Sequence, residues 1–311
     1  MTSLLATLLR IVAFPLLFGG AGIAAWAYYT PDIVTWLMPL IVTVVVTLTL
    51  GLERLVPFAD AWNSVEGAGE DVYYIGVTAS VVALAEAAIW ALIVTSLGPL
   101  DVRAAAIWPD SWPIMAQVFL ALVIGDFLPY VYHRASHRSS GWLWRVHAVH
   151  HAPARLYALN FARFHPLNAA LTAALTLLPL ALLGAPPLVL FVAGVLHNVH
   201  GVLSHSNVDF RLGWLNAIFS MAELHRWHHA HDAQQASGNY GATVLLWDWL
   251  FRTRRQPGRQ VAADGVGLWQ GSELPPRWID QWLYPFAGMA SRWRLALRTA
   301  AQRYCSCCCT S

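Results

Sequence analysis

The sequence contains no lysine, and we attribute this to codon bias because arginine supplies all 19 of the strongly basic residues. Charge of either sign is also scarce. Only 12% of the 311 residues are charged and 57% are hydrophobic, whereas a soluble domain carries about 25% charged residues. This shortage excludes an ordinary soluble domain and indicates a membrane protein. The net charge of +2 is too small to indicate a nucleic-acid partner.

Cysteine is absent from the body of the chain. All four cysteines lie in the final "CSCCCTS", residues 305–311. A disulfide framework is therefore excluded. We expect this tail to be disordered, with a lipidated or metal-binding tail as the alternative.

Six apolar segments are candidates for membrane spans, each of which needs about 20 residues. The fifth is short and meets the sixth at "GAPP", so residues 168–203 read as a hairpin that either crosses the membrane or dips in and returns. The first segment resembles a signal peptide, but we favour an uncleaved span because another span follows at once. The segments are 4–28, 33–52, 72–98, 114–132, 168–184 and 186–203.

Arginine placement predicts the orientation of these spans. Residues 133–164 contain five arginines and no acidic residue, and residues 252–259 add four more arginines. By the positive-inside rule both stretches are cytoplasmic. We therefore expect a multi-pass protein of a bacterial inner membrane.

Histidine is absent before residue 133, yet the chain contains 13 histidines. Each group of them lies at or just beyond the predicted cytoplasmic end of a span, so one face of the membrane collects them all. The groups are His133 and His137 in "HRASH"; His147, His150 and His151 in "HAVHH"; His165; His197, His200 and His205 in "HNVHGVLSH"; and His225, His228, His229 and His231 in "HRWHHAH".

The spacing within these boxes is typical of metal ligands. Positions i and i+4 share one helix face, so His133 and His137 can point at one ion. Adjacent histidines diverge by about 100° on a helix, so an H-x-x-H-H box can give one pair to one ion and its remaining ring to a second. The pattern predicts a two-metal site, although imidazole suits iron, zinc, copper and nickel alike. Taken singly, His165, His197 and His231 are more typical of interfacial or hydrogen-bonded core residues.

Two other classes of protein use similar residues. A metal-ion transporter would place its ligands near mid-span, whereas these histidines cluster at span ends. A membrane zinc hydrolase would usually carry H-E-x-x-H, and no histidine in this chain is followed by glutamate.

The boxes and their neighbours resemble the integral-membrane fatty acid hydroxylase / sterol desaturase superfamily. The resemblance covers residues 126–253, under half of the chain, and includes "DFLPYVYHRASH", "LWRVHAVHH", "NFARFHP", "HGVLSHSN", "ELHRWHH" and "GNYGATVLLWDWLFRT". It implies a non-haem di-iron centre of two Fe²⁺ ions, dioxygen as co-substrate, and oxidation of an unactivated C–H bond of a lipid.

Carried over residue by residue, the resemblance implies ten metal ligands. His200 and His205 are the least regular pair, because residues five apart lie about 140° apart on a helix and converge only if it frays near Ser204. His197 and His200 have the better helical spacing, but the resemblance favours "HGVLSHSN". The implied ligands are His133, His137, His147, His150, His151, His200, His205, His225, His228 and His229.

Several further residues are candidates for supporting roles. Asp126 is an acid within an apolar span, seven residues before His133 on the same helix face, and we expect it to orient a ligand imidazole. The alternative is a buried acid paired with Arg134 or water. We expect Asn160, Arg163 and His165 in "NFARFHP" to line a substrate entrance or contact the ligands, the alternative being a helix start at Pro166. His197 and His231 are further candidates, and Glu86 has no assigned role.

The expected architecture is an all-α, multi-span membrane protein with a helical cytoplasmic cap. We expect one domain over residues 1–311, with transmembrane helices in 1–132, a di-iron region in 133–253 and a tail in 254–311. Within the tail, helical spacing over 278–304 predicts an amphipathic helix on the membrane face or, alternatively, one packed over the histidine region.

Hydroxylation is the expected reaction, because the bacterial members of the family mostly resemble hydroxylases. A desaturase on the same scaffold is the alternative. The sequence lacks a glycine-rich nucleotide fingerprint and a haem-attachment motif, so we expect electrons from a separate ferredoxin or b-type cytochrome with its reductase. The candidate substrates are fatty acyl chains, sterols, hopanoids, carotenoids and aminolipids.

Overall fold

The computed structural model describes residues 3–104, 107–138, 141–258, 260–269 and 271–287. Over these residues the chain is helical, and β pairing is limited to isolated bridges such as Pro57 with Val208. The predicted all-α class is confirmed. The helices are α1 (Ser3–Ala27), α2 (Val34–Leu55), α3 (Ala68–Ala104), α4 (Ile114–Ser136), α5 (Trp142–His151), α6 (Pro166–Leu182), α7 (Pro187–His205), α8 (Ala222–His228), α9 (Ala233–Ala236), α10 (Leu246–Leu250) and α11 (Trp278–Leu283), with 3₁₀ turns η1 (Asp60–Trp62), η2 (Ala158–Ala162), η3 (Gly213–Ala217) and η4 (Tyr284–Phe286).

Five of these helices are long and apolar enough to cross a membrane: α1, α2, the 68–93 part of α3, α4 and α7. The remaining expected span, the fifth at 168–184, is α6, whose 17 residues rise about 26 Å, less than the hydrocarbon thickness of about 30 Å. A helix satisfies its own backbone hydrogen bonds, which is why apolar segments of this length adopt it in a membrane.

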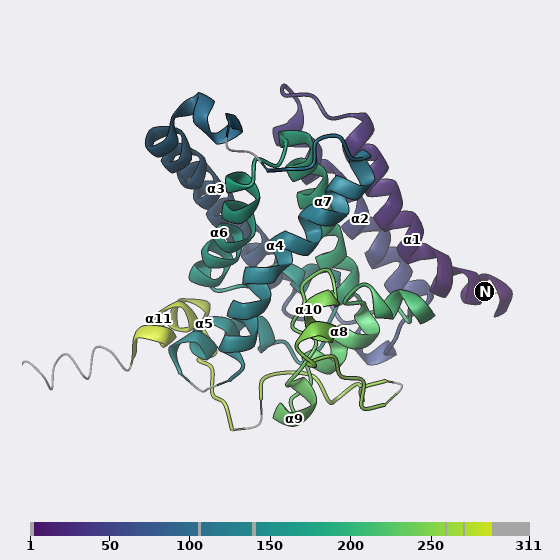
Figure 1. The fold of residues 1–311 in the computed structure, drawn as a ribbon. Helices are drawn as coiled ribbons and strands as arrows, with labels where there is room; N and C mark the ends of the chain where they lie inside the picture. The colour runs from purple at the N-terminus through teal and green to yellow at the C-terminus, as the bar shows by residue number, and fades with distance from the viewer. Residues whose placement is uncertain (1–2, 105–106, 139–140, 259, 270, 288–311) are drawn as a thin grey trace, which may run out of the picture.

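The long helices are arranged around α4. It packs against both α6 and α7; α3 accompanies α6, and α1 and α2 accompany α7. Figure 1 shows the α3–α6 pair on one side of α4 and the α7–α2–α1 group on the other. The predicted 168–203 hairpin is therefore splayed, with its two arms on opposite sides of α4 and few direct contacts between them.

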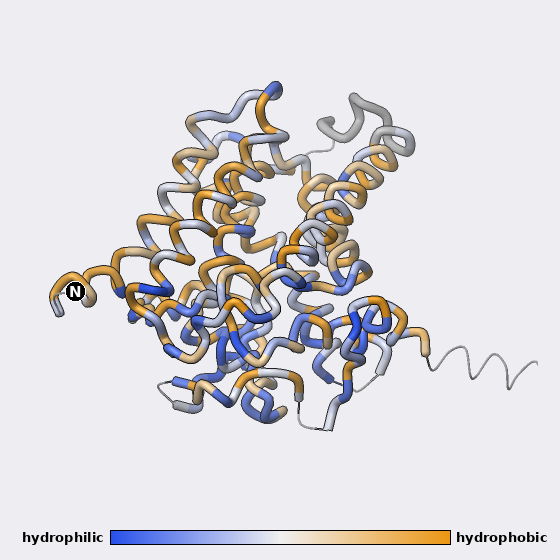
Figure 2. Tube along the Cα trace, turned by 180° about the vertical axis from the view of Figure 1, so that it is seen from behind, coloured by the Kyte–Doolittle hydropathy of each residue, from blue (hydrophilic) through white to orange (hydrophobic). Residues whose placement is uncertain are grey.

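The shorter elements gather at one end of the long helices, which we call the polar end. Apolar residues dominate the long helices, and hydrophilic residues collect at this end (Figure 2). Glu53, at the end of α2, accepts the backbone N–H groups of Ala158 (2.7 Å) and Asn207 (3.0 Å). The buried Arg226 donates to the carbonyl of Ser206 at 2.9 Å. These bonds attach η2, the end of α7 and α8 to one another.

The described beginning of the C-terminal segment packs against α3. The Tyr74 hydroxyl donates to Oε1 of the buried Gln281 at 2.8 Å, and the rings of Trp278 and Trp282 contact Tyr73. These contacts are to α3, whereas the Arg145 guanidinium of α5, 5.3 Å from the centroid of the Tyr284 ring, gives a contact of the kind expected for packing of residues 278–304 over the histidine region. The rest of that expected helix and the cysteine-rich tail lie outside the described residues.

Candidate metal centre

Nine histidines form two adjacent groups where the long helices meet the polar end. Within each group the candidate ligand nitrogens all lie within 4.8 Å of one another. The two groups adjoin, because the rings of His151 and His229 stack with centroids 4.3 Å apart. The first group is His133, His137, His147, His151 and His228, and the second is His150, His205, His225 and His229.

Two helices supply ligands to both groups. On α5, His147 and His151 enter the first group, and His150 enters the second. At α8 the pair four residues apart belongs to the other group: His225 and His229 enter the second group, and His228 enters the first. In each box the i, i+4 pair lies on one helix face, and the remaining ring turns to the neighbouring group.

The loop of residues 238–244 orients two of the rings. Nδ1 of His133 lies 2.7 Å from the carbonyl oxygen of Tyr240, and Nδ1 of His228 lies 2.8 Å from that of Gly238. A carbonyl oxygen can only accept, so Nδ1 carries the hydrogen in both rings. The lone pair is then on Nε2, which in both rings is buried and has no hydrogen-bond partner among the described residues.

Two further rings are oriented in the same way. His147 places Nδ1 3.1 Å from Oδ1 of Asn168, an oxygen that also accepts the Tyr132 hydroxyl at 3.0 Å. His205 places Nδ1 2.8 Å from the carbonyl of Gly201. Partners of this kind fix the tautomer and the ring orientation of metal-binding histidines. Asn168, which lies two residues after "NFARFHP", could not be predicted as a partner because it carries no sequence signal of its own.

Two buried carboxylates hold the loop of residues 238–244. Asp248 accepts the backbone N–H groups of Tyr240 (2.9 Å) and Gly241 (2.7 Å). Asp126 accepts the backbone N–H groups of Thr243 and Val244, each at 2.7 Å. The motif "GNYGATVLLWDWLFRT" therefore has a structural explanation: it presents two carbonyl groups to two histidines. From the sequence alone this motif had no assigned role.

Glycine is required at the start of this loop. A Cβ atom on Gly238 would lie 2.3 Å from the carbonyl oxygen of Thr253, far inside van der Waals contact. The next residue, Asn239, has φ of +55°, a left-handed conformation that asparagine tolerates better than most residues. The close approach brings the Gly238 carbonyl to His228.

The donor spacing fits bound metal ions. Nε2 atoms approach one another at 3.0 Å (His147 with His151), 3.1 Å (His205 with His225) and 3.1 Å (His225 with His229). Imidazole nitrogens bound to one ion at about 2.0–2.1 Å lie about 2.9–3.4 Å from each other in octahedral or tetrahedral geometry. Such clusters of buried lone pairs repel one another unless a cation lies among them. The residues present therefore fit two metal ions with imidazole ligands.

Burial keeps these imidazoles neutral. Desolvation, the largest cause, and the neighbouring histidines lower the pKa of His137, His150, His151, His225 and His229 well below the usual value near 6.5. Burial also lowers the pKa of His147 and His228, although each has a hydrogen bond that opposes the shift. Neutral imidazole is the form that binds metal.

Aromatic rings cover the centre. Trp144 and Trp269 stack with centroids 4.0 Å apart, and the Trp269 ring lies 5.1 Å from that of His137. Phe164 stacks on His150 at 4.4 Å. These side chains exclude water from both groups, which strengthens electrostatic interactions within the site.

His200 lies outside both groups. Helix α7 stays regular to His205, so the two rings point about 140° apart. The His200 ring packs edge-on against Phe14 and Phe18, with centroids 6.0 and 6.2 Å away, and lies 6.2 Å from Phe219. The fray near Ser204 that would have brought His200 to the centre is absent from the described helix.

Asp126 differs from its expected role. Its hydrogen bonds are to the loop backbone, and the histidine beside it is His197, whose Nδ1 lies 3.8 Å from Oδ1. His197 belongs to neither group. Asp126 is linked to the candidate ligand His133 through the loop, because its hydrogen bonds hold the segment that carries the Tyr240 carbonyl.

The three residues of "NFARFHP" that were expected at the entrance or the ligands, Asn160, Arg163 and His165, make structural contacts in this fold. Asn160 closes a capping box at η2 with Tyr157, and Arg163 makes ion pairs with Asp71 (2.9 Å) and Glu70 (3.0 Å). His165 caps α6 by accepting the backbone N–H of residue 167. These contacts agree with the helix-start alternative and place none of the three in either histidine group.

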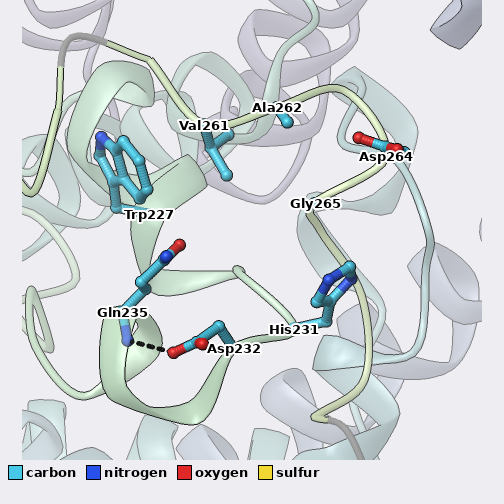
Figure 3. Close-up of a pocket in the computed structure, with 8 residues that line it drawn as sticks. All are labelled: Trp227, His231, Asp232, Gln235, Val261, Ala262, Asp264 and Gly265. Carbon is cyan, nitrogen blue, oxygen red and sulfur yellow. Dashed lines mark hydrogen bonds between the residues drawn. The ribbon is translucent and has the colours of Figure 1, made fainter.

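His231 also lies outside both groups. Its side chain borders a surface pocket with Asp232, Gln235, Asp264 and Trp227 (Figure 3). The carboxylate of Asp232 caps α9 by accepting the backbone N–H of Gln235 at 3.0 Å. The pocket is therefore separate from the two histidine groups.

Comparison with known proteins agrees with this geometry. The fatty acid hydroxylase family model matches residues 118–253, which include both histidine groups. An ornithine lipid hydroxylase of Rhizobium tropici is 38% identical over 226 residues, 70% of this chain and 66% of that protein. A methylsterol monooxygenase of Arabidopsis thaliana is 32% identical over 147 residues, 46% of this chain and 54% of that protein.

A very-long-chain aldehyde decarbonylase of Oryza sativa is 34% identical over 143 residues, 45% of this chain and 52% of that protein. The matched stretches thus span from about half to just under two thirds of these relatives' lengths. No solved structure matches the chain. The family match, the similarity to these relatives and the histidine boxes together place this chain in the fatty acid hydroxylase family.

Proposed function

We propose that this protein is a membrane lipid hydroxylase that inserts one oxygen atom of dioxygen into an unactivated C–H bond. The observation that carries the proposal is the pair of adjacent, buried, all-histidine groups at the end of a bundle of apolar helices. In the described chain no carboxylate belongs to either group. The printed activities of the similar proteins, lipid hydroxylase and sterol monooxygenase, support the same reaction class.

Two iron ions are the cofactors in this proposal. The first would be held by His133, His137, His147, His151 and His228, and the second by His150, His205, His225 and His229. Iron bound there supplies the redox chemistry by which dioxygen is reduced. The balanced reaction is R–H + O₂ + 2 e⁻ + 2 H⁺ → R–OH + H₂O. The two electrons come from an external ferredoxin or b-type cytochrome.

The chain's own residues prepare the site for this chemistry. The carbonyl groups of Gly238, Tyr240 and Gly201 and the amide oxygen of Asn168 hold four imidazoles with Nε2 facing the centre. The aromatic cover keeps bulk water away from the reacting carbon. Because the groups lie where α4 and α7 end, a lipid can present its carbon from the membrane without leaving it.

The proposal places the histidine groups on the cytoplasmic face of a bacterial inner membrane. The arginine-rich stretches 133–164 and 252–259 support this orientation by the positive-inside rule. A soluble electron donor in the cytoplasm would then reach the polar end directly.

The test uses the full chain, loaded with Fe²⁺, reconstituted with bacterial lipid extract and reduced by dithionite or a reductase–ferredoxin pair. Under ¹⁸O₂ we expect lipid-dependent dioxygen uptake and a lipid product heavier by one ¹⁸O atom. A product lacking two hydrogens and carrying no ¹⁸O would indicate the desaturase alternative. Movement of metal into vesicles without lipid oxidation would contradict the proposal and favour a transporter.

A further inference from the structure

Helix α7 carries a partly exposed stripe that runs along the helix toward the metal centre. Most residues of α7 are buried, but Leu190, Gly194, His197 and Gly201 are partly exposed. They recur at i, i+4, i+7 and i+11 and so share one helix face. His205 of the second histidine group follows one turn after Gly201 on this face.

Side chains of α2 and α4 flank the stripe. A Cβ atom on Gly194 would lie 3.3 Å from the Met38 side chain of α2, and His197 reaches toward Asp126 of α4. Figure 1 shows α7 between these two helices, with α6 beyond α4. A lipid chain lying along this face would reach the histidine groups at its lower end.

The two ring nitrogens of His197 differ: Nδ1 has a hydrogen-bond partner within the described chain, and Nε2 has none. Nδ1 lies 2.9 Å from Oγ1 of Thr243 and 3.8 Å from Oδ1 of Asp126. The His197 side chain is 33% exposed, whereas that of Asp126 is 3% exposed. Nε2 is not among the buried atoms and has no hydrogen-bond partner in the described part of the chain.

An imidazole with an unpaired ring nitrogen raises the free energy of a membrane-spanning helix in the bilayer. Hydrocarbon offers no hydrogen bonds, so polar side chains at this depth pair with one another or mark the path of a ligand. His197 lies eight residues from His205, about 12 Å along the axis at 1.5 Å per residue. A group bound to Nε2 is therefore inside the bilayer, at a fixed distance from the centre.

We propose that His197 is the hydrogen-bonding site for a carbonyl group of the lipid substrate. The proposal rests on the proposed function and narrows its substrate to lipids with an ester or amide carbonyl, as opposed to plain hydrocarbons. In this proposal the Thr243 hydroxyl is the donor to Nδ1, so the ring hydrogen is on Nε2. Nε2 then donates to a carbonyl oxygen, the common acceptor of membrane lipids.

Asp126 and Thr243 are positioning residues for this contact. The carboxylate fixes the backbone at Thr243 through hydrogen bonds to residues 243 and 244, and the threonine hydroxyl fixes the ring. The same loop carries the Tyr240 carbonyl that orients the ligand His133. One loop thus orients both a histidine of the metal centre and the histidine proposed to bind the lipid carbonyl.

The test measures lipid binding without turnover. The full chain in detergent is offered equal amounts of ester-linked phosphatidylethanolamine and its ether-linked analogue with the same chains, which lacks the carbonyl groups. Retained lipid is quantified by native mass spectrometry. A neutral hydrogen bond is worth about 3–10-fold in affinity, so we expect an ester preference of that size for the wild type.

Three variants distinguish recognition of the lipid carbonyl by His197 from a general effect on the packing of α7. His197→Leu should bring the ester-to-ether ratio to about one, while its metal content stays at the wild-type level. His197→Gln, whose amide can donate in the same direction, should retain most of the preference. Asn198→Leu is the matched control, because Asn198 also lies on the partly exposed face but already donates to the Gly194 carbonyl at 2.9 Å; its ratio should equal that of the wild type.

Three results would overturn the inference, two of them from the wild type and His197→Leu. One is a wild-type ratio of one, and the other is an unchanged preference in His197→Leu. Loss of the preference in Asn198→Leu as well would show a general effect of packing and would equally contradict it. Because the measurement needs no dioxygen, an ester preference in a protein that never oxidises lipid would refute the proposed function and leave the binding site standing.

Discussion

The hydrogen on one ring nitrogen decides whether a histidine can bind a metal through the other. In this protein that choice is made by oxygen atoms that can only accept, those of Gly201, Gly238, Tyr240 and Asn168. Three of the four are backbone carbonyls, which no substitution can delete. The exception is Asn168, so the effect of this hydrogen bond is best tested there.

Asn168→Ala removes the acceptor that orients His147. Loss of such an outer partner typically lowers metal affinity about 10–100-fold, and we expect that loss here. The measurement is metal retention against a graded chelator, with total metal determined by mass spectrometry. Asn198→Ala, which removes an asparagine bound to a helix carbonyl away from the centre, should retain metal like the wild type. Equal retention in both variants would contradict the assigned role.

Acid should destabilise the metal-free protein. Burial lowers the pKa of the centre's histidines in the folded state, whereas unfolded histidine titrates near 6.5. Below about pH 6.5 the unfolded chain therefore binds protons that the folded chain does not, so this stability is present above that pH and lost below it. We expect the Tm of metal-free protein in detergent to fall between pH 7.5 and pH 5.5. A constant or rising Tm would contradict buried neutral imidazoles.

Among the elements, the loop of residues 238–244 is hydrogen-bonded both to two buried carboxylates and to two histidines of the site. Two carboxylates from two helices, Asp126 on α4 and Asp248 on α10, hold its backbone. It in turn orients ligands from α4 and α8. The loop thereby couples the membrane-embedded helices to the polar end.

Gly238→Ala tests this coupling. The new Cβ would meet the Thr253 carbonyl at 2.3 Å, so the loop must shift and take its own carbonyl away from His228. We expect a lower Tm and a metal affinity reduced by at least about tenfold. Gly76→Ala is the matched control, since a Cβ there has nothing within 4 Å. Wild-type metal affinity in Gly238→Ala would refute the role of the loop.

Helix α7 offers a direct comparison between two histidines. His205 lies in the second group, and His200 packs among Phe14 and Phe18. We expect His200→Phe to retain the metal content and fold of the wild type, because an aromatic ring is replaced by another of similar shape. His205→Ala should lose about one ion per chain. Loss of metal in His200→Phe would restore the ten-ligand assignment.

The helices could be predicted from the sequence, but the contacts between them could not. Apolar length predicted the six long helices, and i, i+4 spacing predicted which histidines share a face. Carbonyl partners could not be predicted, because His133 and Tyr240 are 107 residues apart and a backbone oxygen leaves no mark in a sequence. Asp126 was expected to contact a ligand from its helical register, yet the loop comes between them. His200 was assigned by resemblance against its helical geometry, and the structure follows the geometry.

At the scale of the whole molecule, helix order fixes which loops share a side. The tip between α1 and α2 lies at the end opposite α9 (Figure 1). After the tail cysteines are replaced, Asp32→Cys and Gln234→Cys provide exposed thiols on the two sides. We expect Asp32→Cys to react with impermeant maleimide in intact cells, and Gln234→Cys to react only after permeabilisation. The opposite pattern would place the histidine groups outside the cytoplasm.

Metal stoichiometry tests the central claim, two adjacent sites built from different histidines, most directly. The full chain, loaded anaerobically with Fe²⁺ and freed of loose metal, should contain two ions per chain. His137→Ala in the first group and His225→Ala in the second should each retain about one, and the double variant none, with all three still folded. Two ions retained in both single variants, or complete loss in either one, would contradict two separate sites.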